Sequence, residues 1–256
     1  MSGFYAVFRK ETANFFVSPI AYAVLTIFLL ISGFIFWANV SYMSVISLQA
    51  ASNPMIGERI NITDFVVRPL MQNMGFILLF VMPLITMRVF SEEKKSGCIE
   101  LLLTYPLTDM AVLAGKFLSV ILLLLIILAG TLPMMFLLFG LSQPDPGTIA
   151  SGYLGLILMG SSFLALGMFI SSLTENQIVA AAGSFGAALL FWILGWSSML
   201  TGEHVGAVLK QLAILEHLES FNKGVIALSD LSFFVLFTAF FLFLTLRSLE
   251  THRWRG

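Results

Sequence analysis

Charge and cysteine are scarce in this sequence. Its 256 residues include 13 Lys and Arg, 14 Asp and Glu, and a single cysteine, Cys98. Charged residues make up 11% of the chain, against about 25% in a typical soluble domain. One cysteine excludes a disulfide within the chain, and a net charge of −1 gives no reason to expect a nucleic-acid partner. The composition therefore excludes an ordinary soluble domain and a disulfide-stabilised one.

Patterns that bind phosphate or carry out catalysis are also absent. Gly115-Lys116 lacks both the upstream glycine and the following Ser or Thr of a phosphate-binding loop. The three histidines, His204, His217 and His252, are scattered, and no carboxylate pair or nucleophile with a neighbouring base stands out. We therefore expect no ATP hydrolysis, no catalytic residues, no metal and no cofactor in this chain itself.

Long uncharged apolar segments, in contrast, are abundant, and the chain is 59% hydrophobic. A helix needs about 20 apolar residues to cross a bilayer core of about 30 Å, whereas barrel strands alternate over about ten residues. The pattern predicts an all-α integral membrane protein, with residues 1–256 forming one transmembrane domain and Pro133 bending the third span. The six predicted spans cover residues 20–40, 65–87, 110–139, 148–173, 177–199 and 231–247.

Charged residues are missing from the middle of all six spans. Ion-coupled transporters usually keep Asp, Glu, His or Arg within their spans, because those groups carry the coupling ion. The most polar pair at membrane depth here is Gln72 and Asn73, in the second span. This absence argues against a proton-driven or sodium-driven pump, so any energy must come from another protein. At its ends, the last span would place Asp230 and Arg247 among the lipid headgroups.

The distribution of Lys and Arg predicts the orientation, because these residues are enriched in cytoplasmic loops. An inside N-terminus places nine of them in the cytoplasm and four outside. The nine are Arg9, Lys10, Arg88, Lys94, Lys95, Lys116, Arg247, Arg253 and Arg255, and the four are Arg59, Arg68, Lys210 and Lys223. Both termini, residues 88–108 and the short loop 173–177 are therefore predicted to be cytoplasmic.

The N-terminal segment 4–17 is amphipathic. On a helix, Phe4, Val7 and Phe8 share one face, and charged residues follow them. This pattern favours a helix that lies in the inner membrane interface and ends at Ser18-Pro19, since the residue before a proline disfavours helix. The alternative is a frayed tail before the first span.

Two segments are predicted on the outer side. Residues 41–64 form a polar connection with turns at Asn53-Pro54 and Ile56-Gly57. Residues 200–230 are predicted to form two short helices that pack on, or dip into, the outer leaflet. Their apolar residues recur at helical spacing, at Val205, Val208, Leu212 and Leu215.

The segment 88–108 stands out because it is charged between two membrane-length runs. In "VFSEEKKSGCIELLL" a charged half and an apolar half meet at Gly97, which permits a sharp change of direction. The leucines of the second half need burial. Two interpretations are open: a helix lying on lipid, or a helix that inserts into a groove on a partner protein.

The sequence resembles the ABC-2 permeases, the membrane subunits of ATP-driven exporters. The resemblance is carried by four blocks in matching order: "KETANFFVSPIAY", "RVFSEEKKSGCIELLLTYPLTDMAVLAGKFL", "SLTENQIVA" and "LEHLESFNKGVIALSDL". Within this family the sequence is more similar to the gliding-motility-associated and nitrous-oxide-reductase-maturation-like branch. Cys98 stands where that pattern more often has Thr, and both residues are small.

The resemblance implies a bacterial inner-membrane permease of type V exporter-like architecture. Two copies of the chain, or the chain and a paralogue, would pair around a central path. Two copies of a separate ATPase, which binds ATP and Mg²⁺, would dock below them, and an auxiliary membrane or periplasmic protein would be a further partner. An alternative from another class is a membrane anchor that relays ATPase motion to a periplasmic partner without transport.

The resemblance also implies which residues act. The ATPase-coupling residues would be Glu92, Glu93, Lys94, Gly97, Glu100, Leu101 and Leu102 in the main segment, with Thr174, Glu175 and Asn176 in a smaller loop. Spans two and five tend to line the path in this family, which would assign that role to Gln72, Asn73, Ala180 and Ser184. Small residues in span five also allow close helix packing within one subunit, which is the alternative for its two residues.

Overall fold

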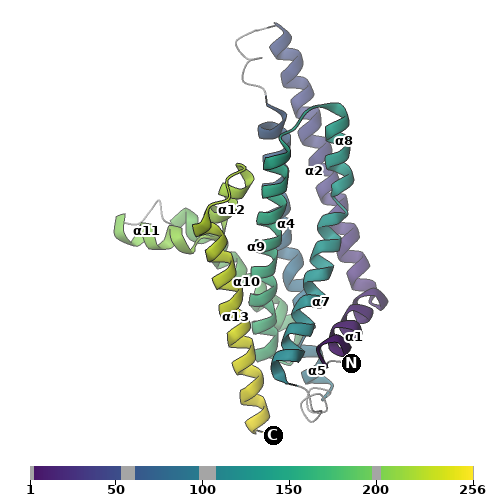
Figure 1. The fold of residues 1–256 in the computed structure, drawn as a ribbon, viewed down its shortest axis with the longest axis vertical. Helices are drawn as coiled ribbons and strands as arrows, with labels where there is room; N and C mark the ends of the chain where they lie inside the picture. The colour runs from purple at the N-terminus through teal and green to yellow at the C-terminus, as the bar shows by residue number, and fades with distance from the viewer. Residues whose placement is uncertain (1–2, 53–60, 98–107, 198–202, 256) are drawn as a thin grey trace.

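The computed structural model describes residues 3–52, 61–97, 108–197 and 203–255. Every regular element in this part of the chain is a helix, and six helical stretches are long and apolar enough to span a membrane (Figure 1). The predicted fold class is therefore confirmed. The predicted turns at Asn53-Pro54 and Ile56-Gly57 lie outside the described residues.

The helices follow the predicted order. The spanning stretches contain α2 (Pro19–Ser52), η1 with α4 (Thr63–Val67 and Arg68–Thr86), α7 with α8 (Asp109–Ala129 and Leu132–Leu141), α9 (Pro146–Leu173), α10 (Gln177–Ser197) and α13 (Leu228–Arg255). Four shorter helices are α1 (Gly3–Val17), α5 (Ser91–Lys95), α11 (Glu203–Leu212) and α12 (Ile214–Asn222). Both termini lie at the same end of the bundle as α5 (Figure 1).

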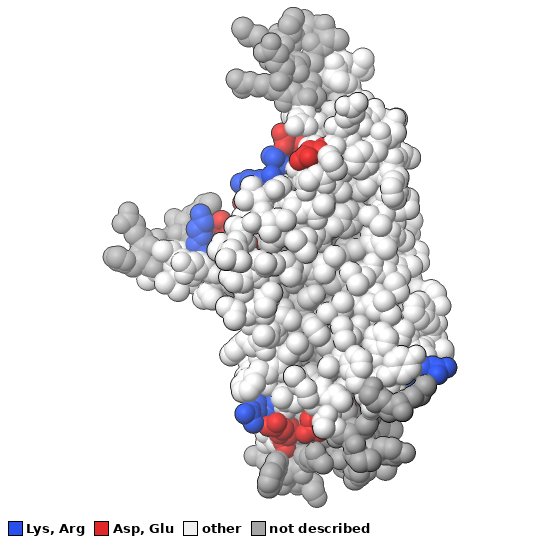
Figure 2. Space-filling view, viewed as in Figure 1, with Lys and Arg blue, Asp and Glu red and all other residues white. Residues whose placement is uncertain are grey.

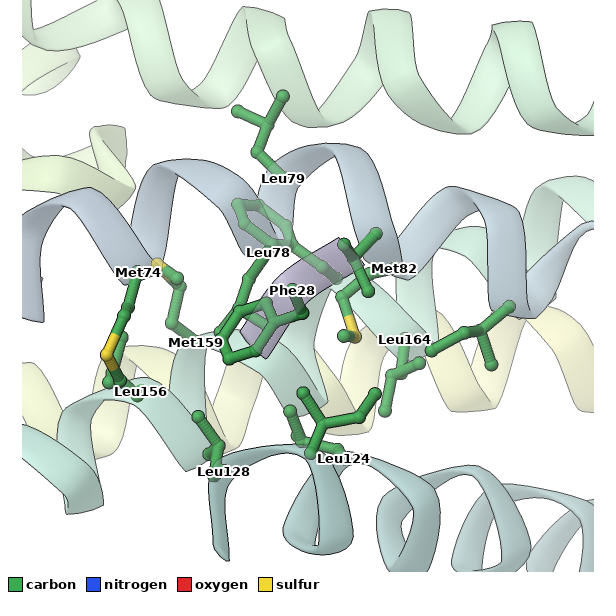
Figure 3. Packing of buried hydrophobic residues seen from close by; sticks show 14 of the residues in the cluster. Phe28, Met74, Leu78, Leu79, Met82, Leu124, Leu128, Leu156, Met159 and Leu164 are labelled. Atoms are coloured by element: carbon green, nitrogen blue, oxygen red, sulfur yellow. The ribbon is translucent and has the colours of Figure 1, made fainter. Parts of the chain in front are cut away.

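The core lies around α4 and α9. About two thirds of the most apolar stretch of each is buried, against 17–39% for the other spanning stretches. Figure 3 shows Phe28 of α2 among Met82 of α4, Leu124 of α7 and Met159 of α9. Small residues on α9 permit this close packing. A Cβ on its Gly160, for example, would come within 2.7 Å of the Leu124 side chain.

The start of α9 is defined by a capping side chain. Asp145 accepts hydrogen bonds from the backbone N–H groups of Gly147 (3.0 Å) and Thr148 (3.2 Å), and from the Thr148 hydroxyl (2.6 Å). Such a cap satisfies donors that a helix N-terminus leaves unpaired. The hydrogen bond from the Thr148 hydroxyl does most to hold the pKa of the Asp145 carboxyl below its usual value, and the two backbone hydrogen bonds lower this pKa further.

The first spanning helix is longer than predicted. The sequence predicted a polar connection from residue 41, but α2 continues to Ser52. Its 34 residues make it about 51 Å long at 1.5 Å per residue. The added turns contain no Gly or Pro, and the hydroxyls of Ser44 and Ser47 donate to carbonyls one turn earlier in the same helix. Polar residues alone therefore do not end this helix.

The third span is interrupted where a bend was predicted. α7 ends at Ala129, and α8 begins at Leu132 with Pro133 in its first turn. The Thr131 hydroxyl lies 2.7 Å from the Leu128 carbonyl and 2.7 Å from the Tyr153 hydroxyl of α9. Irregular backbone at membrane depth needs partners from the protein, and these contacts supply some of them.

The N-terminal helix ends as predicted, at Val17, and α2 begins at Pro19. α1 packs closely on α7, where a Cβ on Gly115 would lie 3.0 Å from the Val7 side chain. Its place at a membrane surface stays a prediction. Figure 2 shows charged side chains gathered near the lower end and on the upper left, with a face free of them in between.

The two short helices between α10 and α13 occupy different environments. α12 packs against α9, α10, α4 and α13, with Ile214, Leu218 and Phe221 fully buried. α11 projects away from the bundle (Figure 1) and leaves Val205 and Val208 exposed. The sequence predicted both helices but not the burial of α12 inside the protein. Asp230, predicted among lipid headgroups, is likewise buried.

Candidate coupling site

The main predicted coupling segment is hydrogen-bonded to the end of α9. The Ser171 hydroxyl accepts hydrogen bonds from the backbone N–H groups of Phe90 (3.2 Å) and Ser91 (3.1 Å), and it donates to the Met87 carbonyl (3.2 Å). These bonds pair backbone groups in the turn between α4 and α5. The short helix α5 is thereby held against the helix that forms the centre of the bundle.

Lys94 joins the two predicted coupling loops. It is buried, its Nζ donates to the Ser172 carbonyl at the end of α9, and it interacts electrostatically with Glu175. Lys94 and Glu175 were assigned to separate segments about 80 residues apart. The structure brings them together at one end of the bundle.

A buried lysine ties α5 to the rest of the fold. The Lys116 Nζ, on α7, lies 2.9 Å from Glu11 Oε1 of α1, 2.9 Å from Glu93 Oε1 of α5 and 2.9 Å from the Val89 carbonyl. Its side chain is only 1% exposed. A buried charge requires partners of this kind, because desolvation is costly. Three helices from distant parts of the sequence therefore meet at one cation.

Two of the assigned residues have partners inside the protein, and two are exposed. Glu93 was expected to contact an ATPase, but its Oε1 faces Lys116 inside the protein, and Lys94 is equally occupied. Glu92 and Gly97 are exposed. Gly97 has a φ of +69° and open space around it, so its role is conformational, as the predicted turn requires. Glu100, Leu101 and Leu102, together with Cys98, lie outside the described residues.

The smaller loop forms a compact turn between α9 and α10. The Thr174 hydroxyl accepts from the Asn176 N–H (3.1 Å), and the Asn176 side chain accepts from the Ile178 N–H (2.9 Å). Glu175 and Asn176 are exposed. This loop and α5 are therefore linked through Lys94.

A cavity of about 410 Å³ lies beside this network. Its lining comes from α1, from the corner between α1 and α2, from residues 88–96 and from Lys116. The lining is charged and includes Lys10, which lies 3.5 Å from Glu93, and Arg88. The cavity lies between α1 and residues 88–96, and Lys116 forms part of its wall.

The residues assigned to the path divide into two groups. Gln72 and Asn73 of α4 are exposed, and Asn73 donates to the Pro69 carbonyl (2.7 Å). Ala180 and Ser184 of α10 are buried within the chain, 0% and 1% exposed. Ala180 and Ser184 therefore pack inside this subunit, and their assignment to a path stays a prediction. Gln72 and Asn73 lie on the surface of this chain.

Sequence reasoning did not find Lys116 and Ser171. Lys116 was counted only as evidence for orientation. One signal was available, because Lys116 is the only lysine in α7 and lies in its second turn, where an apolar segment begins. Ser171 carried no such signal, since serines are common on α9. Its role depends on where α5 lies, which is a tertiary property.

Comparison with known proteins identifies the family of the chain. The chain matches the family described as ABC-2 family transporter protein over residues 5–249. A comparison with curated proteins gives no match. The match spans all six membrane-length helices, the two loops and the Lys116 network. The chain therefore belongs to the ABC-2 family of transporter membrane proteins, as a membrane subunit that is not itself catalytic.

Proposed function

We propose that this chain is the permease subunit of an ATP-driven exporter in a bacterial inner membrane, with both termini in the cytoplasm. A separate ATPase would dock on the exposed residues of α5 and of the loop 174–176. The observation that carries this proposal is the Lys116 network, because it connects the exposed charged segment α5 to α1 and α7.

The contacts suggest how motion would spread from the docking surface. Displacement of α5 would act on α9 through Ser171 and Lys94, and on α7 and α1 through Glu93 and Lys116. Hydrogen-bonded ion pairs transmit position as well as energy, since their geometry is fixed by several bonds. A push at α5 would therefore reach the central helix and the N-terminal helix together.

A second copy of the chain would complete the path. The exposed face of α4 carries Gln72 and Asn73, followed one and two turns later by Phe76 and Phe80. Phe76 contacts Trp192 of α10. This mixed polar and aromatic face suits a path between two copies, with two ATPase chains below. The branch resemblance to gliding-motility and maturation proteins is part of this proposal.

The docking proposal is tested by reversing charge at exposed positions only. The double variant Glu92→Lys, Glu175→Lys would be purified from its host membranes in mild detergent, and Mg²⁺-dependent ATP hydrolysis of the sample measured. We expect at least a tenfold loss of co-purified activity, since breaking partly desolvated interface charge pairs costs about 2–5 kcal/mol. Glu219→Lys, at an exposed position of α12, is the matched control and should retain activity. Equal activity in both samples would refute docking at this surface.

A second measurement separates a transporter from a membrane anchor that only relays motion. In a Cys98→Ser background, Asn73→Cys and Phe80→Cys would be treated with a small water-soluble thiol reagent, with and without ATP. A path predicts labelling that changes with nucleotide, because water reaches these positions in one state. Protection of both positions in every state would favour the anchor.

A further inference from the structure

His217 of α12 is bound through both of its ring nitrogens. Nδ1 lies 2.7 Å from Asp230 Oδ1 of α13, and Nε2 lies 2.9 Å from the Gln211 carbonyl at the end of α11. Its ring stacks on Phe233 with the centroids 4.0 Å apart. One side chain therefore connects three helices near the junction of the last span with the bundle.

These two contacts decide how many protons the pair must hold. A backbone carbonyl can only accept, so Nε2 must carry a hydrogen. Nδ1 faces a carboxylate, which also accepts when ionised. Both contacts are hydrogen bonds only if His217 is doubly protonated beside ionised Asp230, or if Asp230 itself carries the shared proton. In either form the pair holds one proton more than a neutral imidazole beside a carboxylate.

The surrounding elements supply few competing charges. Asp230 is the charged group in contact with His217. Of the helices packed against α12, α9 and α10 contain no charged residue, and α4 has only Arg68, which has its own carboxylate partner. Lys210 of α11 pairs with Glu216 of α12 at 3.5 Å, on a more exposed side. The state of the pair therefore depends chiefly on its own proton.

Loss of that proton removes one of the two bonds. A neutral imidazole has one N–H, and a carboxylate is a stronger acceptor than a carbonyl. Neutral His217 would therefore keep its bond to Asp230 and turn a bare Nε2 toward the Gln211 carbonyl. We propose that the His217–Asp230 pair is a proton-binding clasp that holds α11 to α13, and that α11 is released when the proton is lost. This proposal does not depend on what the protein transports.

Two substitutions distinguish the effect of the shared proton from the effect of side-chain packing. In Asp230→Asn, the amide can donate to a bare Nδ1 while Nε2–H still bonds the Gln211 carbonyl, so the clasp closes without the extra proton. In His217→Phe, the ring still stacks on Phe233 but forms neither bond. The first variant should hold α11 at every pH, and the second should leave it free at every pH.

The experiment measures the distance between α11 and α13 by pulsed electron paramagnetic resonance. Spin labels would be placed at Val208→Cys and Leu236→Cys, both exposed positions, in full-length Cys98→Ser protein in lipid nanodiscs. Samples at about pH 5.5 and about pH 9.5 lie on either side of the range in which histidine usually titrates. We expect a narrow distribution at low pH and a distribution at least twice as wide at high pH, with Asp230→Asn narrow at both.

Each outcome bears on the clasp. A wild-type distribution that stays narrow at both pH values would overturn it. So would equal broadening in Asp230→Asn, because another titrating group would then be responsible. If His217→Phe does not fold, the comparison between wild type and Asp230→Asn decides the matter alone, since Asn closely matches Asp in shape.

Discussion

At the scale of single residues, Lys116 is a buried charge that depends on three partners. Its Nζ has two carboxylate partners and one carbonyl, all at 2.9 Å. The attraction offsets the cost of removing three charges from water, and the balance depends on every partner being present. Removal of the cation alone would leave Glu11 and Glu93 facing Lys10, which is 53% exposed and lies 3.9 Å from Glu11 Oε1 and 3.5 Å from Glu93 Oε1.

Lys116→Met should therefore destabilise the protein by about 3–5 kcal/mol, the range for breaking a buried ion pair. The apparent melting temperature in detergent would show it. The matched comparison is a triple variant, Lys116→Met with Glu11→Gln and Glu93→Gln, which removes all three charges. We expect the triple variant to melt above the single one. If it melts lower, the carboxylates do not depend on Lys116 in the way described.

At the scale of elements, the glycines of α9 determine how closely its neighbouring helices pack against it. A Cβ on Gly155 would lie 2.7 Å from the Phe221 side chain of α12, and one on Gly167 would lie 2.1 Å from the Thr86 hydroxyl and 2.8 Å from the Thr86 Cβ of α4. Real atoms do not approach so closely, and the Thr86 Cβ is fixed to the backbone. The distance from α9 to its neighbours is therefore set by the absence of side chains.

Gly167→Ala should accordingly destabilise the bundle by about 1–3 kcal/mol, the usual cost of overpacking, although alanine favours helix more than glycine does. The melting temperature of the purified protein measures the effect. Gly140→Ala in α8 is the control, since nothing lies within 4 Å of its Cβ position, and it should be neutral or slightly stabilising. Equal effects at both positions would mean that helix propensity, and not steric contact, determines the change in stability.

The elements also show how far sequence reasoning reaches. Hydropathy located all six spans, because a run of about 20 apolar residues has few other uses. It could not show that α12 lies inside the bundle, because the pattern of Ile214, Leu218 and Phe221 suits a lipid surface equally well. Nor could it show that Glu93 points inward, because its partner Lys116 is 23 residues away on another helix. Charged residues are usually exposed, and the exception is set by tertiary contacts.

At the scale of the whole molecule, the two ends of the bundle differ. One end holds both termini, α5 and the loop 174–176 (Figure 1). α11 and α12 lie apart from that end, beside the start of α13. The predicted orientation, with nine Lys and Arg inside and four outside, would place the first of these regions in the cytoplasm.

A membrane-impermeant maleimide tests that orientation. Cys98, the only thiol, should remain unlabelled in intact spheroplasts and react in inverted vesicles, because it follows α5 directly in the sequence. Lys223→Cys in a Cys98→Ser background should show the opposite pattern, since Lys223 ends α12 and is exposed. Detergent-solubilised samples control for a partner that shields either thiol. Labelling of Cys98 from outside would reverse the assigned orientation.

The distance along the chain between Glu11 and Lys116 has a consequence for biosynthesis. The two residues are 105 positions apart, and synthesis proceeds at about 5–20 residues per second. A nascent chain therefore carries Glu11 for roughly 5 to 20 seconds before its lysine exists. During that interval the carboxylate must stay hydrated, so α1 cannot settle into its final place. Docking of the first helix must wait until the third span has been inserted.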